Sequence, residues 1–383
     1  MSICHCFFFI DACGFEVLRG QDAFTCFGEA RPLRSVFGYS SACVPSILSG
    51  LYPDEHLHWN FYQRCGPGLR VPRWLHWIPG SIRDRGRVRA KLSRFVKQAN
   101  NIEGYFQLYQ MPLDALDQYS TCEKRNIFQP GGLNAGRSIV DTIQELNSPA
   151  WVSDWHKPES ETWRLAGQAA ADPKIEFLFV YAASLDAWLH DHTRQHPDLP
   201  GELQAIAQRI NQVLDAARAN HDEVRFHIFS DHGMATINEH LDLFPALQQT
   251  GLRLHRDFHA VIDSTMLRCW YPDEATRARV RDALSGYEQI TLLDDAYLQR
   301  ERCLFPDRRF GEDIWLARPH CLLVPSHMGT VPLAAMHGYD VEHEDSYASY
   351  LSNDPAAAPA AIPDIHGLML DALHEIQSRR QCA

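Results

Sequence analysis

Three short runs of apolar residues each end in an aspartate. FFFI leads into Asp11, EFLFVYAASL leads into Asp186, and RFHIFS leads into Asp231. Continuous apolar runs of this length are typical of strands that are buried on both faces of a parallel sheet. In open α/β sheets, ligands bind just beyond the carboxyl ends of such strands. The pattern therefore predicts a parallel sheet with three acidic side chains at its functional edge.

Segments with helical spacing alternate with these strands. Apolar residues recur at intervals of three and four in residues 201–219, and a final helix is expected over residues 364–380. This alternation favours a parallel sheet with helices on both faces. Two later apolar runs, residues 260–270 and 320–325, are expected to extend that sheet or to pair as edge strands.

Residues 55–135 differ in character and predict an insertion between two core elements. They contain Trp59, Trp74 and Trp77, and then a basic stretch over residues 82–99. The basic side chains lie off a single apolar helical face. That face is expected to consist of Val88, Leu92, Phe95, Val96 and Ala99.

Composition adds limits on the partners. The chain has 383 residues, of which 45% are hydrophobic and 22% charged, as in ordinary globular proteins with a sizeable core. A net charge of −12 argues against a nucleic-acid polymer as partner, because phosphate backbones need cationic contacts. Small phosphorylated substrates remain compatible with this charge, since bound metal ions reverse the local field.

The cysteines and the N-terminus bear on the compartment. The 11 cysteines are odd in number and irregularly spaced, and none forms a Cys-x-x-Cys pair, which favours free thiols in a reducing compartment. The N-terminal MSICHCFFFI has no basic region and too short an apolar stretch for a signal peptide. No run approaches the roughly 18 apolar residues of a membrane span. We therefore expect a cytoplasmic protein without a transmembrane segment.

Histidines accompany two of the strand-end aspartates. His190 follows Asp186 by four positions, so both share a face if the strand turns directly into a helix. His232 follows Asp231 directly, and His337 lies in MHGYD. Carboxylate oxygen and imidazole nitrogen suit zinc and related divalent ions. Each residue alone is a weak signal, because an aspartate at a strand end is often a helix cap, but their joint occurrence predicts a metal site.

A serine-rich turn precedes a short helix that Gly50 is expected to end. Ser40 and Ser41 lie where the unpaired N–H groups of a helix N-terminus can hold a phosphate. A serine hydroxyl is a poor nucleophile until a base or a metal activates it. Without the metal candidates, a helix cap would be the preferred interpretation of these serines.

The order of these motifs resembles the alkaline phosphatase superfamily, and within it the type I phosphodiesterase/nucleotide pyrophosphatase branch. The resemblance rests on Asp11, SSACVPSILSGLYPDEH, Asp186-x-x-x-His190, SDHGM and MHGYD, and it spans nearly the whole chain. It implies an alkaline-phosphatase-like three-layer α/β/α sandwich with a mostly parallel central sheet. We therefore expect a single catalytic domain over residues 1–383, with residues 55–135 as an inserted cap or lid. Residues 354–383 would form an Ala/Pro linker and a C-terminal helix.

The resemblance also implies two divalent metal ions, most readily Zn²⁺, with Mn²⁺ as the alternative. One ion would be held by Asp186, His190 and His337. The other would be held by Asp11, Asp231 and His232, together with the hydroxyl of the nucleophile Ser40.

The resemblance also gives the position of the nucleophile, by counting residues back from the glycine of the GLYP element. The family's nucleophile precedes the glycine of the GLYP element by ten positions, which gives Ser40 and leaves Ser41 in reserve. The segment CVPS superficially resembles the sulfatase motif, but that motif needs an arginine where Ile47 stands. It also needs a glycine ten residues after its cysteine, whereas Gly50 is only seven residues from Cys43.

Several residues are candidates for substrate binding. Phosphodiesterases of this type hold a phosphate oxygen with an asparagine, and Asn60 lies one position from the expected place. The aromatic residues Trp59, Phe61, Tyr62, Trp74 and Trp77 could stack on a base or line an acyl groove, or they could form the core of the cap. The basic helix could contact lipid headgroups, although a solvated helix face is the favoured interpretation.

The sequence thus predicts a metal-dependent hydrolase of phosphodiester or nucleotide pyrophosphate bonds that forms a phosphoseryl intermediate on Ser40. Within the same superfamily, the alternatives are a phosphonate-bond hydrolase, a phosphomonoesterase and a phosphotransferase. From a different class, the alternative is a non-catalytic metal-binding protein. The sequence does not give the oligomeric state.

Overall fold

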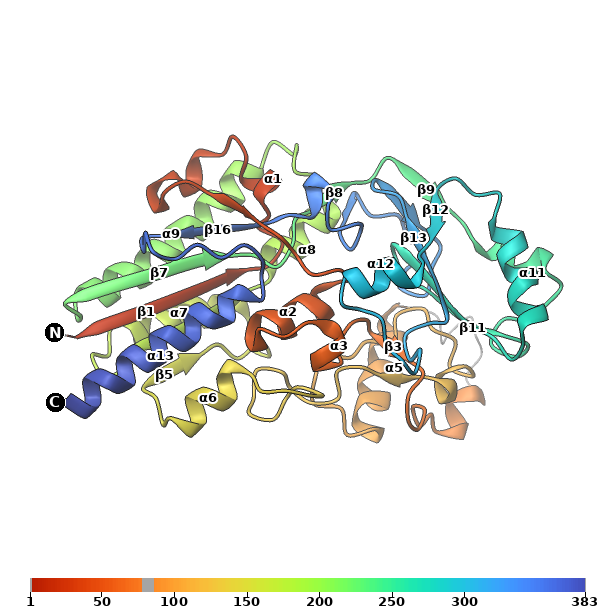
Figure 1. The fold of residues 1–383 in the computed structure, drawn as a ribbon, viewed down its shortest axis with the longest axis horizontal. Helices are drawn as coiled ribbons and strands as arrows, with labels where there is room; N and C mark the ends of the chain where they lie inside the picture. The colour runs from red at the N-terminus through yellow and green to blue at the C-terminus, as the bar shows by residue number, and fades with distance from the viewer. Residues whose placement is uncertain (1, 78–85, 383) are drawn as a thin grey trace.

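A six-stranded sheet forms the centre of the molecule in the computed structural model, which describes residues 2–77 and 86–382 (Figure 1). Its strands in spatial order are β2 (Arg31–Leu33), β16 (Ala348–Ser352), β7 (Glu223–Phe229), β1 (Ile3–Ile10), β6 (Phe177–Ala182) and β5 (Ala150–Val152). Strands β7, β1, β6 and β5 run parallel, whereas β16 runs antiparallel to β7. The mostly parallel central sheet is confirmed.

Helices cover both faces of this sheet. One layer contains α2 (Ser40–Ser49), α6 (Ile139–Glu145) and α13 (Asp364–Cys382), and the other contains α7 (Glu159–Ala170) and α9 (Leu199–Arg218). Side chains of β1 alternate between the two layers, as the pleat of a strand requires. Phe7 and Phe9 pack in the cluster with α2 and α13, whereas Phe8 and Ile10 pack in the cluster with α7 and α9. The three-layer α/β/α sandwich is thus confirmed.

A second sheet lies beside the sandwich and was not predicted. Its four antiparallel strands are β10 (His259–Ile262), β11 (Met266–Trp270), β13 (Asp313–Ala317) and β12 (Ile290–Leu292). The apolar run over residues 260–270 forms the β10–β11 hairpin of this sheet, so the expectation that it extends the central sheet is wrong. The run over residues 320–325 contains β14 (Cys321–Leu323), which pairs with β9 (Glu239–Leu241). Most apolar residues of both runs pack in a third hydrophobic cluster, whereas Val261 and Trp270 pack against the insertion and Met266 packs in the main core.

The predicted insertion has its own small core. Apolar side chains between Tyr62 and Tyr119 form a separate cluster, and β3 (Tyr62–Gln63) pairs with β4 (Ser120–Thr121). Trp59, in contrast, packs in the main core, so the separately packed part is narrower than residues 55–135. Residues 82–85 of the basic stretch lie outside the described residues.

Helix α5 (Gly86–Ala99) is amphipathic as expected, but its buried face differs from the prediction. Leu92 and Val96 are buried, whereas Phe95 is 38% exposed and packs edge-to-face on Trp74. Arg89 takes the inner position instead, because its guanidinium donates hydrogen bonds to the carbonyls of Leu108 and Met111. A long side chain can bury its stem and still satisfy its charged head in this way.

The remaining elements connect these layers. The helices are α1 (Phe15–Leu18), α3 (Pro53–His56), α8 (Ser184–Asp191), α10 (Phe244–Gln249), α11 (Glu274–Leu284) and α12 (Asp295–Arg300). The 3₁₀ helices are η1 (Asp22–Phe27), η2 (Arg73–Trp77), η3 (Leu116–Gln118) and η4 (Glu344–Ser346). A last strand pair joins β15 (Ala335–Met336) to β8 (Ala235–Thr236).

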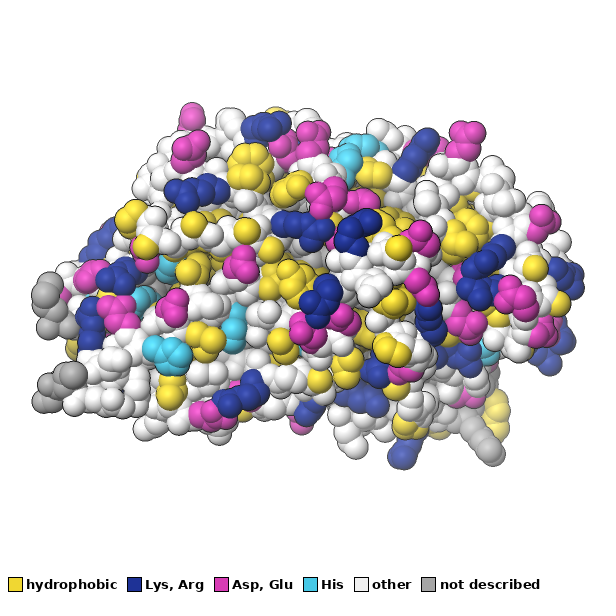
Figure 2. All heavy atoms as spheres, in the orientation of Figure 1, with side chains coloured by type: hydrophobic (Ala, Val, Ile, Leu, Met, Phe, Trp, Pro, Cys, Tyr) yellow, Lys and Arg dark blue, Asp and Glu magenta, His cyan; other side chains and the backbone are white. Residues whose placement is uncertain are grey.

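Basic and acidic side chains are interspersed over the face shown in Figure 2, so the net negative charge does not gather in one patch there. The ten cysteines whose side chains the structure describes are all free, in agreement with the expected free thiols. Within residues 2–77 and 86–382, no helix combines the length and apolar character that a membrane crossing needs. The cytoplasmic location stays a prediction.

Candidate two-metal active site

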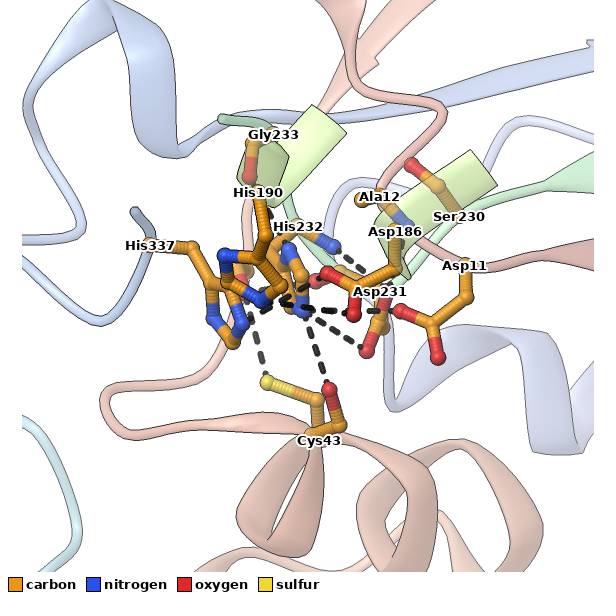
Figure 3. A network of polar contacts seen from close by, with 12 residues as sticks. Asp11, Ala12, Cys43, Asp186, His190, Ser230, Asp231, His232, Gly233 and His337 are labelled. Carbon is orange, nitrogen blue, oxygen red and sulfur yellow. Dashed lines mark hydrogen bonds and ion pairs between the residues drawn. The ribbon is translucent and has the colours of Figure 1, made fainter. Parts of the chain in front are cut away.

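Neighbouring elements of the sheet bring the predicted acidic residues to one edge. Asp11 follows β1 directly, and Asp231 follows β7 after one residue, so the two carboxylates leave adjacent parallel strands on the same side. Asp186 lies in the first turn of α8, just after β6. His190 lies one turn further along the same helix, as the spacing predicted, and His337 follows β15 (Figure 3).

Asp186, His190 and His337 form the first of two ligand groups. Each offers one ligand atom, and these atoms all lie within 4.8 Å of one another. Asp186 Oδ2 is 3.4 Å from His190 Nε2, and Asp186 Oδ1 is 3.6 Å from His337 Nε2. His190 Nδ1 donates to the Ala335 carbonyl at 3.1 Å, which leaves its Nε2 lone pair facing the group.

Asp11, Asp231 and His232 form the second group, also within 4.8 Å. His232 Nε2 is 3.2 Å from Asp231 Oδ2 and 3.6 Å from Asp11 Oδ1. His232 Nδ1 donates to the Gly233 carbonyl at 2.9 Å, so its Nε2 lone pair also faces the ligand group. The His232 and His337 rings stack with centroids 3.7 Å apart, which joins the two groups into one site.

Burial shapes the electrostatics of these carboxyl groups. It raises the pKa of Asp11 well above the ordinary value, and the charges of Asp231 and Asp186 add to this rise. Burial also raises the pKa of Asp231 to about 7. Burial works in the same direction on Asp186, but the hydrogen bond and charge of His190 outweigh it and hold the Asp186 pKa below its usual range. Without a bound cation, the negative charges of the second group are therefore unfavourable in the folded protein.

Divalent cations fit this arrangement. Three carboxylate oxygens and one ring nitrogen of the two groups are buried without any hydrogen-bond partner, namely Asp11 Oδ1, Asp186 Oδ1, Asp231 Oδ2 and His337 Nδ1. Buried polar atoms normally find partners, so unpaired ones point to an absent ligand or ion. The donor atoms are carboxylate oxygens and imidazole nitrogens, which are ligands of zinc and manganese.

Groups behind the ligands hold them in place. The Tyr181 hydroxyl donates to Asp11 Oδ2 at 2.7 Å, and the Ala12 amide donates to Asp231 Oδ1 at 3.3 Å. Gly233 is required because neighbouring backbone approaches it closely. A Cβ at Gly233 would lie 2.3 Å from the Asp345 carbonyl oxygen, and one at Gly14 would lie 2.3 Å from Gly233 Cα.

The two candidate serines differ in their surroundings. Ser40 is the first residue of α2, and its Oγ lies 3.0 Å from His232 Nε2, beside the second ligand group. Ser41 Oγ donates to the Trp59 carbonyl at 3.0 Å. The Cys43 thiol is buried and donates to the Val36 carbonyl, and burial raises its pKa far above the ordinary value. Ser40 is therefore the hydroxyl nearest the ligand groups.

Gly50 ends α2 in the left-handed conformation, with φ of 71°, as predicted. This end fixes the length of the helix and therefore the distance between Ser40 and the GLYP element.

A cavity of about 630 Å³ opens beside these groups. Its lining includes Asp11, Ser40, Ser41, Asn60, Asp186, His190 and His337. The rest of the wall is largely apolar or aromatic and comes from the insertion, from the sandwich and from the segment after β14, for example Phe61, Tyr105, Tyr109, Phe128, Trp155, Leu323, Met328 and Met336. None of the lining residues in the described part of the chain is lysine or arginine.

Most of the aromatic candidates for substrate binding do not reach this cavity. Trp59 is fully buried in the main core, where its Nε1 donates to the Phe37 carbonyl, so its predicted role as a substrate contact is wrong. Trp74 and Trp77 are 50% and 85% exposed and lie outside the cavity lining. Tyr62 is buried in the core of the insertion. Only Phe61 of this set lines the cavity, together with Asn60.

Many cavity residues had not been identified from the sequence, and five of those with polar or large aromatic side chains are Tyr105, Tyr109, Glu123, Trp155 and Asp263. Asp263 follows the apolar run AVI and thus carries the same strand-end signal that marked Asp11. The other four lie in irregular segments, where no periodicity marks the side that faces the cavity.

Comparisons with known proteins agree with this architecture. The murine ectonucleotide pyrophosphatase/phosphodiesterase 5 structure is 14% identical and superposes with a TM-score of 0.67, covering 98% of this chain and 95% of that one. The human counterpart has the same identity and TM-score, with 97% and 95% covered. An inactive variant of the murine protein in complex with AMP matches with a TM-score of 0.65 at 14% identity, with 98% and 95% covered. At this identity the likeness shows the fold.

Comparison with curated proteins finds no matching sequence. A model of the family described as type I phosphodiesterase/nucleotide pyrophosphatase matches residues 105–357, which is well over half of the chain. As its motifs predicted, the chain therefore belongs to the type I phosphodiesterase/nucleotide pyrophosphatase family of phosphoric ester hydrolases within the alkaline phosphatase superfamily.

Proposed function

We propose that the protein hydrolyses phosphodiester or nucleotide pyrophosphate bonds with two divalent metal ions and Ser40 as the nucleophile. The observation that carries the proposal is the position of Ser40 Oγ, 3.0 Å from His232 Nε2, at the N-terminus of α2 and beside both ligand groups. A binding protein needs the ligand groups alone, whereas a hydroxyl held against them is what nucleophilic displacement requires.

Asp186, His190 and His337 would hold one ion, and Asp11, Asp231 and His232 would hold the other. When bound, such ions lower the pKa of a coordinated hydroxyl or water and neutralise charge on the phosphoryl group. Zinc suits the mixture of histidine and aspartate ligands, and manganese is the alternative.

The chain's own groups orient the reaction. Ser40 Oγ forms a bond to phosphorus while the bond from phosphorus to the departing oxygen breaks, and water then cleaves the phosphoseryl bond. The free N–H groups and partial positive charge of the α2 N-terminus favour a phosphoryl group at that position. Asn60, on the cavity wall, would donate to a phosphoryl oxygen.

The cavity favours a diester over a monoester. A monoester carries a second negative charge, and the described cavity wall offers no lysine or arginine to meet it. The largely apolar and aromatic wall suits a substrate with a sizeable organic group on the phosphate. The AMP complex of the structurally similar murine protein supports a nucleotide group as the organic part of such a substrate.

Initial rates on three substrate classes test the proposal. A nitrophenyl nucleotide diester, a nitrophenyl monoester and phosphonoacetate would be compared with zinc and with manganese, after removal of bound metal by chelation. The diester should react fastest, and chelation should abolish the rate. A large preference for the monoester or the phosphonate would replace the proposed substrate class. Metal binding without turnover of any substrate would favour the non-catalytic alternative.

A further inference from the structure

A buried charged network adjoins the cavity and contributes Asp263 to its wall, outside the two metal-ligand groups. Arg268 in β11 is fully buried, and Asp263 after β10 is 1% exposed. Arg268 Nε donates to Asp263 Oδ2 at 2.7 Å. The same guanidinium donates through its Nη1 to the carbonyls of Tyr62 at 2.7 Å and Phe310 at 3.1 Å. The pair therefore joins the second sheet to the insertion.

Stability alone does not account for this pair. Removing two charges from water costs free energy that their attraction often fails to repay, and apolar residues of similar size would pack the site at least as well. The pair is also the only buried aspartate–arginine contact in the described chain that borders the cavity. A role in positioning a cavity residue would explain why the charges are placed there.

The residue that the network holds is Asn60. Its Nδ2 donates to Asp263 Oδ2 at 3.1 Å, and its Oδ1 accepts a hydrogen bond from the Phe61 amide at 2.7 Å. A carboxylate only accepts and a backbone amide only donates, so one orientation of the Asn60 side chain satisfies both contacts. In that orientation Asp263 accepts one N–H of Nδ2, the second N–H has no partner among the described residues, and Asn60 itself lines the cavity.

We propose that Asp263, supported by Arg268, is a positioning residue that fixes the Asn60 amide so that its free N–H meets a phosphoryl oxygen of the substrate. This inference rests on the proposed phosphodiesterase function. It assigns to the second sheet a part in the reaction, because Asp263 and Asn60 are 203 positions apart and meet only in the folded protein. A donor held in advance contributes more to a transition state than one that must be ordered during the reaction.

A double-mutant cycle tests the inference through kcat/KM for the nitrophenyl diester. Asp263→Ala and Asn60→Ala should each lower kcat/KM by about tenfold to a hundredfold, the range expected for one hydrogen bond to a charged group. The double variant should lose no more than the larger single loss, because both substitutions remove the same oriented donor. Asp263→Glu, which moves the carboxylate by one methylene group, serves as the second variant if Asp263→Ala does not fold, and it should also lower kcat/KM without adding to the loss caused by Asn60→Ala.

Asp313→Asn is the matched control. Asp313 is 1% exposed and lies in the same sheet, where Arg277 and Arg281 bind it, but it does not line the cavity. This variant should lower the melting temperature without changing kcat/KM beyond about twofold, and its effect should add to that of Asn60→Ala.

Additive losses for Asp263 and Asn60, or an Asp263 variant as active as the parent protein, would overturn the inference. Either result would leave the phosphodiesterase proposal intact, since wild-type turnover and its loss in Ser40→Ala are measured on the same substrate. Absence of diester hydrolysis by the wild-type protein would overturn the proposed function itself.

Discussion

Replacing Asp231 with asparagine is expected to stabilise the metal-free protein at neutral and alkaline pH. The substitution keeps the acceptor of the two backbone hydrogen bonds, because Asp231 Oδ1 accepts from the amides of Ala12 and His232. Its new amide nitrogen would take the place of Oδ2, which is buried without a hydrogen-bond partner. The variant therefore removes a charge and leaves the local backbone contacts in place.

The expected magnitude follows from the pKa of Asp231. Burial and the charge of Asp186 raise this pKa from the ordinary 3.8 to about 7, against the hydrogen bond from Ala12. At about 1.36 kcal/mol for each pH unit, ionising Asp231 in the folded protein costs up to about 4 kcal/mol. A raised carboxyl pKa contributes stability that is complete below pH 3.8 and is lost as pH rises through 7. The advantage of the variant should therefore grow between about pH 4 and pH 7 and stay constant above.

Urea unfolding of both proteins in the presence of a chelator, at pH values from 4 to 9, measures this difference. Titrating groups distant from Asp231 contribute equally to both proteins and cancel, whereas the pKa of Asp11 should fall in the variant because the charge of Asp231 helps to raise it. Added zinc should raise the unfolding free energy of the wild-type protein far more than that of Asp231→Asn, because a ligand has been removed. A difference in unfolding free energy between the two proteins that stays constant from pH 4 to pH 9 would contradict a raised pKa of Asp231.

Three further outcomes are expected. Tyr181→Phe removes the hydroxyl that donates to Asp11 Oδ2 and should weaken binding of one metal ion by about tenfold to a hundredfold in a competition titration with a chelator. Burial lowers the pKa of His327 to about 3 and that of His255 to about 4. The stability that these neutral histidines contribute should therefore be lost as pH falls below 6.5. His327→Gln should make the unfolding free energy less dependent on pH in acid unfolding curves. Trp59→Ala should cost about 3–5 kcal/mol of unfolding free energy, because the side chain is fully buried, and a change in KM without loss of stability would contradict its assignment to the core.

The sequence was sufficient to predict the site residues that directly follow regular strands. Asp11 and Asp231 end apolar runs, and adjacent parallel strands must bring such residues to one edge of the sheet. Asp186 and His190, four positions apart, lie on one face of a helix because α8 begins just after β6. His337 was a candidate through its occurrence with the other histidines, and the family resemblance alone assigned it to the group with Asp186 and His190.

The cavity wall could not be predicted from the same signals. Trp59 and Tyr62 looked like substrate contacts because aromatic residues serve equally well in a core and in a binding site. Tyr105 and Trp155 lie in or beside irregular segments, where the fold alone decides which side faces the cavity. Asp263 directly follows an apolar run, as Asp11 does, but its strand belongs to the second sheet. The order of apolar runs in the sequence does not show which sheet a strand joins.

The most direct test of the two-metal, Ser40-nucleophile proposal is detection of the covalent intermediate. The protein with zinc would be mixed with a nitrophenyl diester, quenched in acid within one turnover and digested for peptide mass spectrometry. A phosphoryl-containing adduct is expected on Ser40, and it should be absent from the Ser40→Ala variant and from chelated protein. An adduct on Ser41, or hydrolysis at an unchanged rate by Ser40→Ala, would contradict the proposal.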